Sequence, residues 1–284
     1  MPTTTRFAPS PTGLLHLGHA FSAILNHDAA RASGGDFRLR IEDIDRGRCR
    51  PEFEDAIFDD LSWLGLAWDG PVLRQSERFD LYREAISGLY RRGLIYRCFK
   101  TRAELSQLAA APHGPGTGHT VTAPLTRAEE QGLLDEGRPF AWRLNAAAAR
   151  REVGKDHLPW AEALGEETLE RHADIRQVTD EVLARKDTPA SYHLASVIDD
   201  AAQGVSLVYR GEDLASALPL HRLLQELLGL PAPRYRHHRL ITDETGRRLA
   251  KRDRAATLRS LRDLGESPER VRRRLGLSPP RGPA

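Results

Sequence analysis

The chain has 284 residues, of which 40% are hydrophobic and 29% charged, and its formal net charge is +2. This composition is typical of a soluble globular protein and excludes a largely disordered chain, while the apolar runs are too short to span a bilayer. Two cysteines are too few for a disulfide framework, and the N-terminus lacks a secretion-signal pattern, so we expect a cytoplasmic protein.

Residues 6–19 begin with a short apolar strand, continue through a Pro/Gly turn and enter a helix that carries His16 and His19. Apolar residues recur at helical spacing through residues 16–33. A helix start attracts phosphate oxygens, two imidazoles can donate hydrogen bonds to them, and Gly18 allows an adenine or ribose to approach the backbone. The stretch predicts a mononucleotide site, although such a histidine pair could instead pack or bind a metal.

Residues 36–41 alternate as a strand does and lead into an acidic cluster, residues 42–45. Open α/β sheets hold their ligands at this end of a strand. Helices are predicted from Pro51 to Gly65 and over residues 76–92. A helix, a strand and further helices in this order favour a parallel sheet with crossover helices.

The chain changes character after residue 95. Residues 112–118 read as a loop, residues 125–137 as a helix and residues 139–144 as a strand. We interpret this region as a small α+β insertion with its own core.

The α/β pattern resumes near residue 192. We expect residues 192–198 to be strand-like or apolar structure and residues 205–210 to be a strand. An acidic helix start follows at Glu212, and that helix ends at Gly229.

The end of the chain is basic. Residues 246–284 contain twelve Lys/Arg and four Asp/Glu, and they read as largely helical. Such a segment is typical of a protein that binds a polyanion, although a solvated arginine-rich helix has the same composition.

Four motifs in this order resemble the class I glutamyl-tRNA synthetases, in which the HIGH and KMSKS motifs bracket ATP. They are Arg6-Phe-Ala-Pro-Ser-Pro-Thr-Gly13 with His16-Leu-Gly-His19, Arg40-Ile-Glu-Asp-Ile-Asp45, Tyr209-Arg-Gly-Glu-Asp213 and Arg248-Leu-Ala-Lys-Arg252. The resemblance implies an α/β fold with a Rossmann-type parallel sheet and helices on both faces. The implied domains are a first Rossmann half (1–95), an inserted acceptor-type subdomain (96–190), a second half (191–245) and a KMSKS-like loop with a basic helical segment (246–284).

The resemblance also implies the site residues. Arg6 and Arg210 would pair with the two carboxylates of glutamate, so that glutamine would leave a charge unpaired, and Glu42 would receive the amino group. Further glutamate contacts would be Phe7, Ala8, Pro9, Ser10 and Tyr192. ATP would be bound by His16, Gly18, His19 and Lys251, of which His16, His19 and Lys251 would be catalytic.

The KMSKS-like loop departs from the family pattern at two positions. Arg248 replaces the first lysine and Ala250 replaces the serine. Positive charge is therefore kept but a hydroxyl is missing, so loop closure can differ from that of the family.

We expect no anticodon-binding domain, because the chain ends about thirty residues after Lys251. That architecture resembles the glutamyl-queuosine tRNA(Asp) synthetases, which activate L-glutamate with ATP and transfer it to queuosine in the anticodon of tRNA(Asp). The alternatives are a truncated glutamyl-tRNA synthetase that charges a tRNA 3′ end and a non-enzymatic RNA-binding paralogue.

The implied substrates and partners are ATP with Mg²⁺, L-glutamate and queuosine-containing tRNA(Asp), with no membrane partner and a monomeric protein. Many such paralogues carry a zinc site that begins Cys-x-Cys, but here Phe99 and Lys100 follow Cys98. Cys98, His113 and His119 would give only three ligands where structural zinc sites normally have four, so we expect no zinc.

Overall fold

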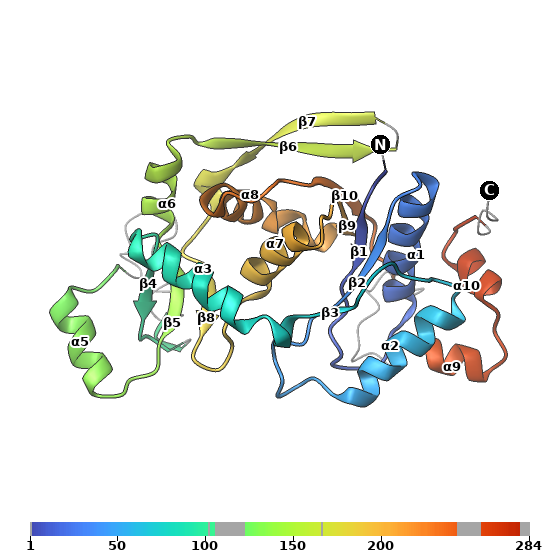
Figure 1. The fold of residues 1–284 in the computed structure, drawn as a ribbon, viewed down its shortest axis with the longest axis horizontal. Coiled ribbons are helices and arrows are strands. Elements are labelled where there is room, and N and C mark those ends of the chain that lie inside the picture. Colours follow the sequence, from blue (N-terminus) through green and yellow to red (C-terminus); the bar gives the residue numbers. More distant parts are fainter. Residues whose placement is uncertain (1, 102, 106–122, 166, 243–256, 279–284) are drawn as a thin grey trace.

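The computed structural model describes residues 2–101, 103–105, 123–165, 167–242 and 257–278. The molecule is elongated: strands β4, β5 and β8 lie at one end and helices α9 and α10 at the other, with α7 and α8 between (Figure 1). This arrangement places the long central part, which carries the sheet, between the insertion and the C-terminal helices.

Parallel strands form the centre of the fold. In one sheet the order is β1-β2-β3, all parallel, and in the second it is β7-β6-β10-β9, with only the β6–β7 pair antiparallel. The backbone N–H groups of Ser206 and Leu207 donate to the carbonyl of Thr4 at 2.9 and 3.1 Å, so β1 and β9 lie side by side. The strands are β1 (Thr5–Phe7), β2 (Phe37–Ile41), β3 (Leu73–Arg74), β6 (His157–Leu164), β7 (Glu167–Asp174), β9 (Leu207–Gly211) and β10 (Arg234–His238).

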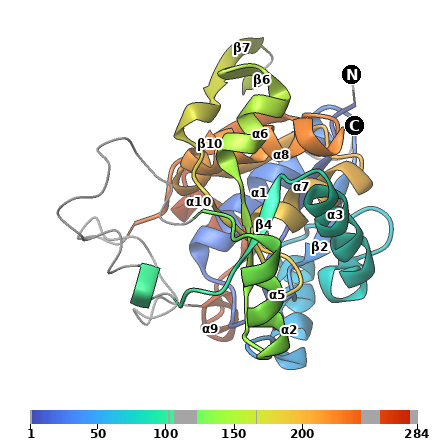
Figure 2. The same ribbon diagram turned by 90° about the vertical axis from the view of Figure 1, so that its left-hand side faces the viewer.

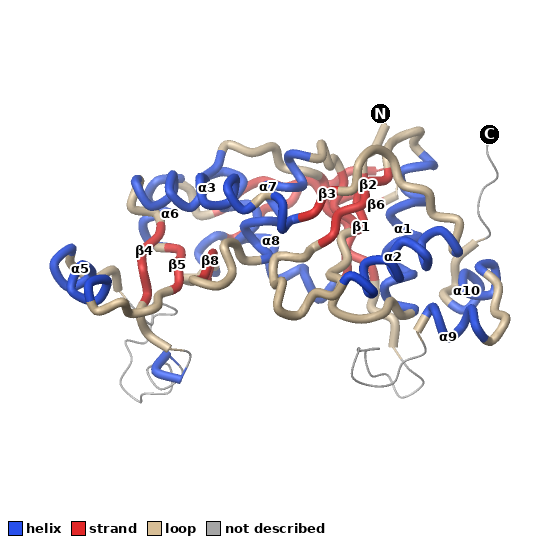
Figure 3. The backbone as a smooth tube through the Cα atoms, turned by 60° about the horizontal axis from the view of Figure 1, so that its bottom comes forward, coloured by secondary structure: helices blue, strands red, loops and turns tan. Residues whose placement is uncertain are grey.

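Helices cover both faces of these strands. Leu39 and Ile41 of β2 belong to the apolar cluster of α1 and α2, whereas Arg40 between them bonds Asp200 of α7 on the opposite face. The tube representation in Figure 3 shows how the helices surround the strands. The expected α/β class, a parallel sheet between helices, is confirmed. The helices are α1 (Leu17–Ala32), α2 (Pro51–Trp63), α3 (Phe79–Arg91), α7 (Tyr192–Ala202) and α8 (Leu218–Leu228).

The C-terminal helices pack on the first half of the sheet. The buried side chains of Leu258, Leu261 and Val271 join the same apolar cluster as α1 and α2. Each such burial stabilises the fold by roughly 1.5–3 kcal/mol, which is enough to dock two short helices. The predicted helical segment is therefore two short helices separated by Gly265, α9 (Leu258–Asp263) and α10 (Pro268–Arg274).

The inserted region has a three-stranded antiparallel sheet in the order β4-β5-β8. The prediction that this region has its own core is wrong, because Leu144 and Leu183 belong to one continuous apolar cluster with Leu194 of α7 and Leu223 of α8. The domain boundaries given above stay predictions. The elements are β4 (Ile95–Cys98), α5 (Arg127–Asp135), β5 (Ala141–Leu144), α6 (Ala146–Val153) and β8 (Val182–Arg185).

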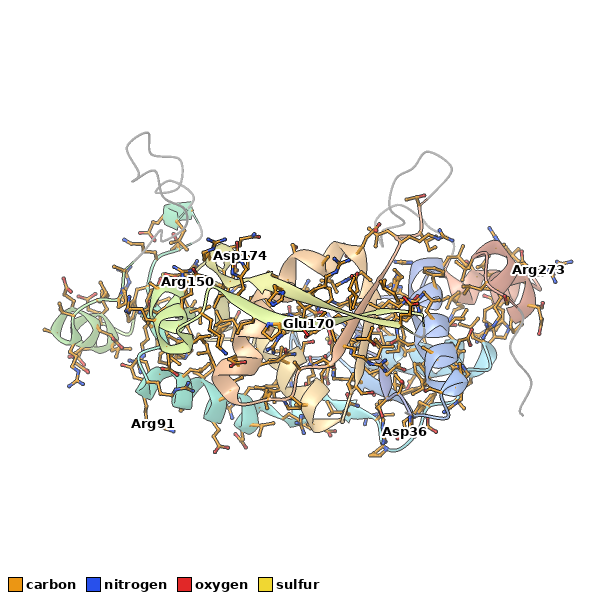
Figure 4. All side chains as sticks on the ribbon, turned by 90° about the horizontal axis from the view of Figure 1, so that it is seen from above. Asp36, Arg91, Arg150, Glu170, Asp174 and Arg273 are labelled. Atoms are coloured by element: carbon orange, nitrogen blue, oxygen red, sulfur yellow. The ribbon has the colours of Figure 1, made fainter. Side chains whose placement is uncertain are left out.

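The β6–β7 hairpin was not predicted. It extends from the insertion and forms the edge of the sheet next to β10. Figure 2 shows it beside β10, and Figure 4 views it from above, with Glu170 and Asp174 on β7. Pro159 and the many charged residues of this stretch mask the alternation of a strand. Its pairing with β10 ties the insertion directly to the central sheet.

Residues 192–198 are helical, so their predicted strand-like character is wrong. Ser191 caps α7, because its hydroxyl accepts a hydrogen bond from the backbone N–H of Leu194. The helix is buried all round from Leu194 to Asp200, so no amphipathic period distinguishes it from a buried strand. Among the described residues, no helix has the length and apolar character that crossing a membrane requires.

Candidate active site

One cavity of about 270 Å³ lies beyond the carboxyl ends of β1, β9 and β10, against the start of α1. This is the edge where parallel sheets place their ligands. The structure brings together every predicted site residue that it describes. These lining residues are Arg6, Phe7, Ala8, Pro9, Ser10, His16, Gly18, His19, Glu42, Tyr192 and Arg210.

The remaining predicted residue, Lys251, lies outside the described residues, as do Arg248 and Ala250. The described chain on either side of that segment borders the site. Ile241 lines the cavity, and beyond the segment Thr257 forms an antiparallel bridge with His16. The N–H of Leu258 donates to the carbonyl of Leu15 at 2.9 Å.

His16 and His19 build the start of α1. His16 is the N-cap: its Nδ1 accepts from the N–H of Gly18 at 3.1 Å, and His19 Nδ1 accepts from the N–H of His16 at 3.2 Å. Because both Nδ1 atoms accept, each neutral ring carries its hydrogen on Nε2, which is the donor form suited to a phosphate oxygen. A Cβ on Gly18 would approach the His16 ring to 3.0 Å, which explains the glycine.

Arg6 and Glu42 belong to a buried ionic network centred on Asp200. Asp200 accepts from Arg6 Nε at 3.0 Å and from Arg40 Nη1 at 2.7 Å, and Arg40 Nη2 lies 3.4 Å from Glu42. Burial alone would raise the pKa of Asp200, but the two arginines hold it down at about 2, so Asp200 is ionised. Burial raises the pKa of Glu42, and Arg40 and Arg6 oppose that rise.

Arg210 is held differently from Arg6. Its Nη1 lies 3.0 Å from His221 Nδ1, and its Nε donates to His237 Nε2 at 3.4 Å. Its Nη2 is buried and has no hydrogen-bond partner among the described residues. A buried donor without a partner costs about 1–3 kcal/mol, so a ligand that accepts from Nη2 would recover that cost.

A second cavity, of about 320 Å³, adjoins the first. Ser10, Glu42 and Tyr192 line both, so these three side chains separate the two spaces. Burial raises the pKa of the Tyr192 hydroxyl, which keeps that group neutral. The second cavity opens between the end of β2 and the insertion, and its other walls are Ile44, Asp45, Arg48, Gln75, Val182, Ala184, Arg185, Thr188, Ala190 and Ser191.

Sequence reasoning missed Asp200, His221 and His237. The pair Asp199-Asp200 in an otherwise apolar run was an available signal, because buried carboxylates need partners. Asp199 accepts from Gln75, Arg78 and Tyr82 and so links α7 to α3 and the 3₁₀ turn before it. The histidines carried no comparable local signal.

The candidate zinc ligands are not brought together by the described residues. Cys98 is buried as a free thiol, and His113 and His119 lie outside the described residues. Within the part of the chain that the structure describes, no three His, Cys, Asp or Glu side chains form a metal-binding group.

Comparison with known proteins adds a family match over nearly the whole chain. The family described as class I tRNA synthetases (E and Q), catalytic domain, matches residues 2–281. The chain is 50% identical to the glutamyl-Q tRNA(Asp) synthetase of Rhodobacter capsulatus, over 96% of this chain and 99% of that protein. It is 38% identical to the glutamate–tRNA ligase of Aquifex aeolicus, over 97% of this chain and 58% of that protein.

Among solved structures, a glutamate tRNA ligase from Elizabethkingia meningosepticum in complex with its amino acid superposes with a TM-score of 0.73 at 32% identity. The match covers 89% of this chain and 52% of that one, so the chain spans about half of the ligase. The methionyl-tRNA synthetase of Mycobacterium tuberculosis, 13% identical with a TM-score of 0.57, is similar in fold alone.

Proposed function

The chain belongs to the catalytic-domain family of the class I tRNA synthetases for glutamate and glutamine, and on that premise we propose that it is a glutamyl-Q tRNA(Asp) synthetase. In this function it activates L-glutamate with ATP and transfers the glutamyl group to queuosine in the anticodon of tRNA(Asp). The similarity to the Rhodobacter protein, 50% identity over 99% of its length, supports this assignment over 3′-end charging.

The single observation that carries the glutamate specificity is the buried Arg210, whose Nη2 has no partner among the described residues. In our proposal Arg210 binds the side-chain carboxylate, and Arg6, held by Asp200, faces the other end of the amino acid. Glu42 lines the same cavity as the two arginines, and its carboxylate accepts hydrogen bonds from the ammonium group of glutamate and offsets its positive charge. Tyr192 and the backbone of residues 7–10 close the remaining sides.

Activation is an in-line displacement at phosphorus. A carboxylate oxygen of glutamate attacks the α-phosphate, a C–O–P anhydride forms, and the bond to the β-phosphate breaks with release of pyrophosphate. The Nε2–H groups of His16 and His19 and the N-terminus of α1 stabilise the negative charge on the phosphate oxygens. Lys251 is proposed to stabilise the leaving pyrophosphate. Mg²⁺ enters as part of the MgATP substrate, ligated by phosphate oxygens.

Transfer needs space for the acceptor next to the mixed anhydride. We assign the second cavity to it, because Ser10, Glu42 and Tyr192 are shared by both cavities. A hydroxyl oxygen of the queuosine base attacks the activated carbonyl carbon, the ester forms, the anhydride C–O bond breaks and AMP leaves, while the hydroxyl proton passes to solvent. No covalent enzyme intermediate is required, so positioning supplies most of the catalysis.

Labelled glutamate and ATP with purified tRNA test the assignment. Queuosine-containing tRNA(Asp) should be labelled, and queuosine-free tRNA(Asp) should not. Nuclease digestion of the labelled tRNA should place the label on the anticodon fragment and not on the 3′-terminal adenosine. Equal labelling of tRNA(Glu) would support 3′-end charging, the alternative that 38% identity to a glutamate–tRNA ligase favours. Absence of glutamate-dependent ATP–pyrophosphate exchange would leave only a non-enzymatic paralogue.

We propose that the enzyme acts as a monomer, and that it acts in the cytoplasm, where both ATP and tRNA are available. Light scattering at micromolar concentration tests the first statement. A dimer that persists on dilution would contradict it.

A further inference from the structure

Arg210 differs from the other arginine of the candidate glutamate site in what holds it. Arg6 is bound to the carboxylate of Asp200, at 3.0 Å. The described residues join Arg210 to no carboxylate; two imidazoles hold it instead, with His221 Nδ1 at 3.0 Å and His237 Nε2 at 3.4 Å. The ring of Tyr235 adds a cation–π contact, 5.3 Å from the guanidinium carbon. A buried cation without a carboxylate partner requires an explanation, because buried charges are normally paired.

The directions of its hydrogen bonds determine the tautomer of the His221 ring. A guanidinium only donates, so His221 Nδ1 must be the acceptor and the ring hydrogen must lie on Nε2. Nε2 lies 3.0 Å from His193 Nδ1 and therefore donates to it. Burial and the charge of Arg210 hold the pKa of His221 well below its usual value, and the same causes lower the pKa of His237 to about 4. Both partners of Arg210 are thus neutral.

The charges around the cavity leave an excess on Arg210. The guanidinium groups of Arg6 and Arg40 and the carboxylates of Asp200 and Glu42 form one connected network that needs no further counter-ion. Arg210 stands outside that network. Asp213 and Arg239, which also line the cavity, carry opposite charges and leave this balance unchanged. Glutamate carries one net negative charge, whereas glutamine carries none, so only glutamate neutralises the site.

We propose that His221, supported by His193 on α7, is a positioning and specificity-determining residue that orients Arg210 through a neutral hydrogen bond and so keeps the guanidinium charge for the substrate's side-chain carboxylate. A carboxylate at position 221 would hold Arg210 equally well but would compete with glutamate for it. This inference rests on the proposed glutamate activation. It predicts that the charge at position 221, rather than its shape, controls the choice of amino acid.

His221→Asn and His221→Asp form the matched test, because their side chains have the same shape and both place an acceptor oxygen near the position of Nδ1. ATP–pyrophosphate exchange is measured with glutamate and with glutamine. The Asn variant should keep the KM for glutamate within a few-fold of the original protein. The Asp variant should raise that KM by about 10–100-fold, and lower the preference for glutamate over glutamine by a similar factor, with a smaller change in kcat. His172→Asp, which adds the same charge on the exposed face of β7, should change neither value.

Equal KM values and equal glutamate preference in the Asn and Asp variants would overturn the proposal, because His221 would then only fill space. If the unsubstituted protein shows no glutamate-dependent exchange, the proposed function itself fails, which is a different result. Should the variants not fold, imidazole ¹⁵N NMR on the unsubstituted protein decides. We expect His221 to remain the Nε2–H tautomer from pH 5.5 to 8, and titration in that range or an Nδ1–H tautomer would contradict the inference.

Discussion

Replacing Asp60 with asparagine should stabilise the protein at neutral pH. Asp60 lies on α2 beneath α9, its carboxylate is buried, and neither oxygen has a hydrogen-bond partner among the described residues. The nearest cation is Arg262, whose Nη1 is 3.9 Å away. Burial therefore raises the pKa of Asp60 from 3.8 to about 6, and Arg262 and Arg259 offset this only in part.

The sign of the effect follows from proton linkage. Between the unfolded and folded pKa values the folded protein keeps a proton that the unfolded chain has lost, so the free energy of unfolding falls as pH rises. Each pKa unit is about 1.4 kcal/mol, so the full cost above the folded pKa is about 3 kcal/mol. Roughly 2 kcal/mol of this develops between pH 4.5 and pH 8. Asparagine cannot ionise, so the variant lacks this component.

Urea unfolding at several pH values measures the effect, with the fluorescence of Trp63 at the end of α2 as one signal. The stability difference between Asp60→Asn and the unsubstituted protein should grow by about 2 kcal/mol from pH 4.5 to pH 8. Asp55→Asn, at an exposed position of the same helix, is the matched control and should show no such trend. A difference for Asp60→Asn that does not change with pH would refute the reasoning, because the carboxylate would then be solvated or paired.

Three further outcomes are expected. Arg185→Ala, in the wall of the second cavity, should leave ATP–pyrophosphate exchange unchanged and slow transfer to tRNA about tenfold, and equal loss of both would argue against an acceptor site there. Combined glutamine substitution of the exposed Arg259, Arg270 and Arg273 should weaken tRNA binding and flatten its dependence on salt, whereas an unchanged slope would mean that this surface is merely solvated. Asp200→Asn should cost about 3–5 kcal/mol of unfolding free energy at pH 7, because it leaves Arg6 and Arg40 without their shared carboxylate. Since the pKa of Asp200 is lowered to about 2, this contribution is present above about pH 4 and is lost as the pH falls toward 2. A variant as stable as the original protein at pH 7 would contradict the role of the network.

The resemblance to the family predicted which residues meet in the cavity, and they meet because the motifs sit near the ends of parallel strands or at helix starts. Arg6 and Arg210 are each one residue before the end of neighbouring strands, and His16 caps the helix that follows β1, so the topology brings them to one edge. Tyr192 was placed in this set although its segment was predicted as a strand. The resemblance therefore identified a residue whose local structure the periodicity misread.

What holds those residues could not be predicted from the sequence. His221 lies in a leucine-rich helix, and only the packing of α8 on β9 directs it at Arg210. The β6–β7 hairpin and the continuous core between the insertion and α7 depend on contacts distant in sequence. The sequence also does not distinguish among the basic residues of the C-terminal segment. Arg272 is buried and donates to the Asp28 carboxylate at 2.8 and 3.0 Å, so it stabilises the fold.

The bridge between His16 and Thr257 limits the distance that Lys251 can lie from the start of α1. Lys251 is six residues from Thr257, and six residues span at most about 22 Å even when fully extended. One ammonium group restricted to a sphere of that radius around the start of α1 has a local concentration on the order of tens of millimolar. The backbone bridge thus keeps the cation that we propose for the leaving pyrophosphate tethered to the start of α1.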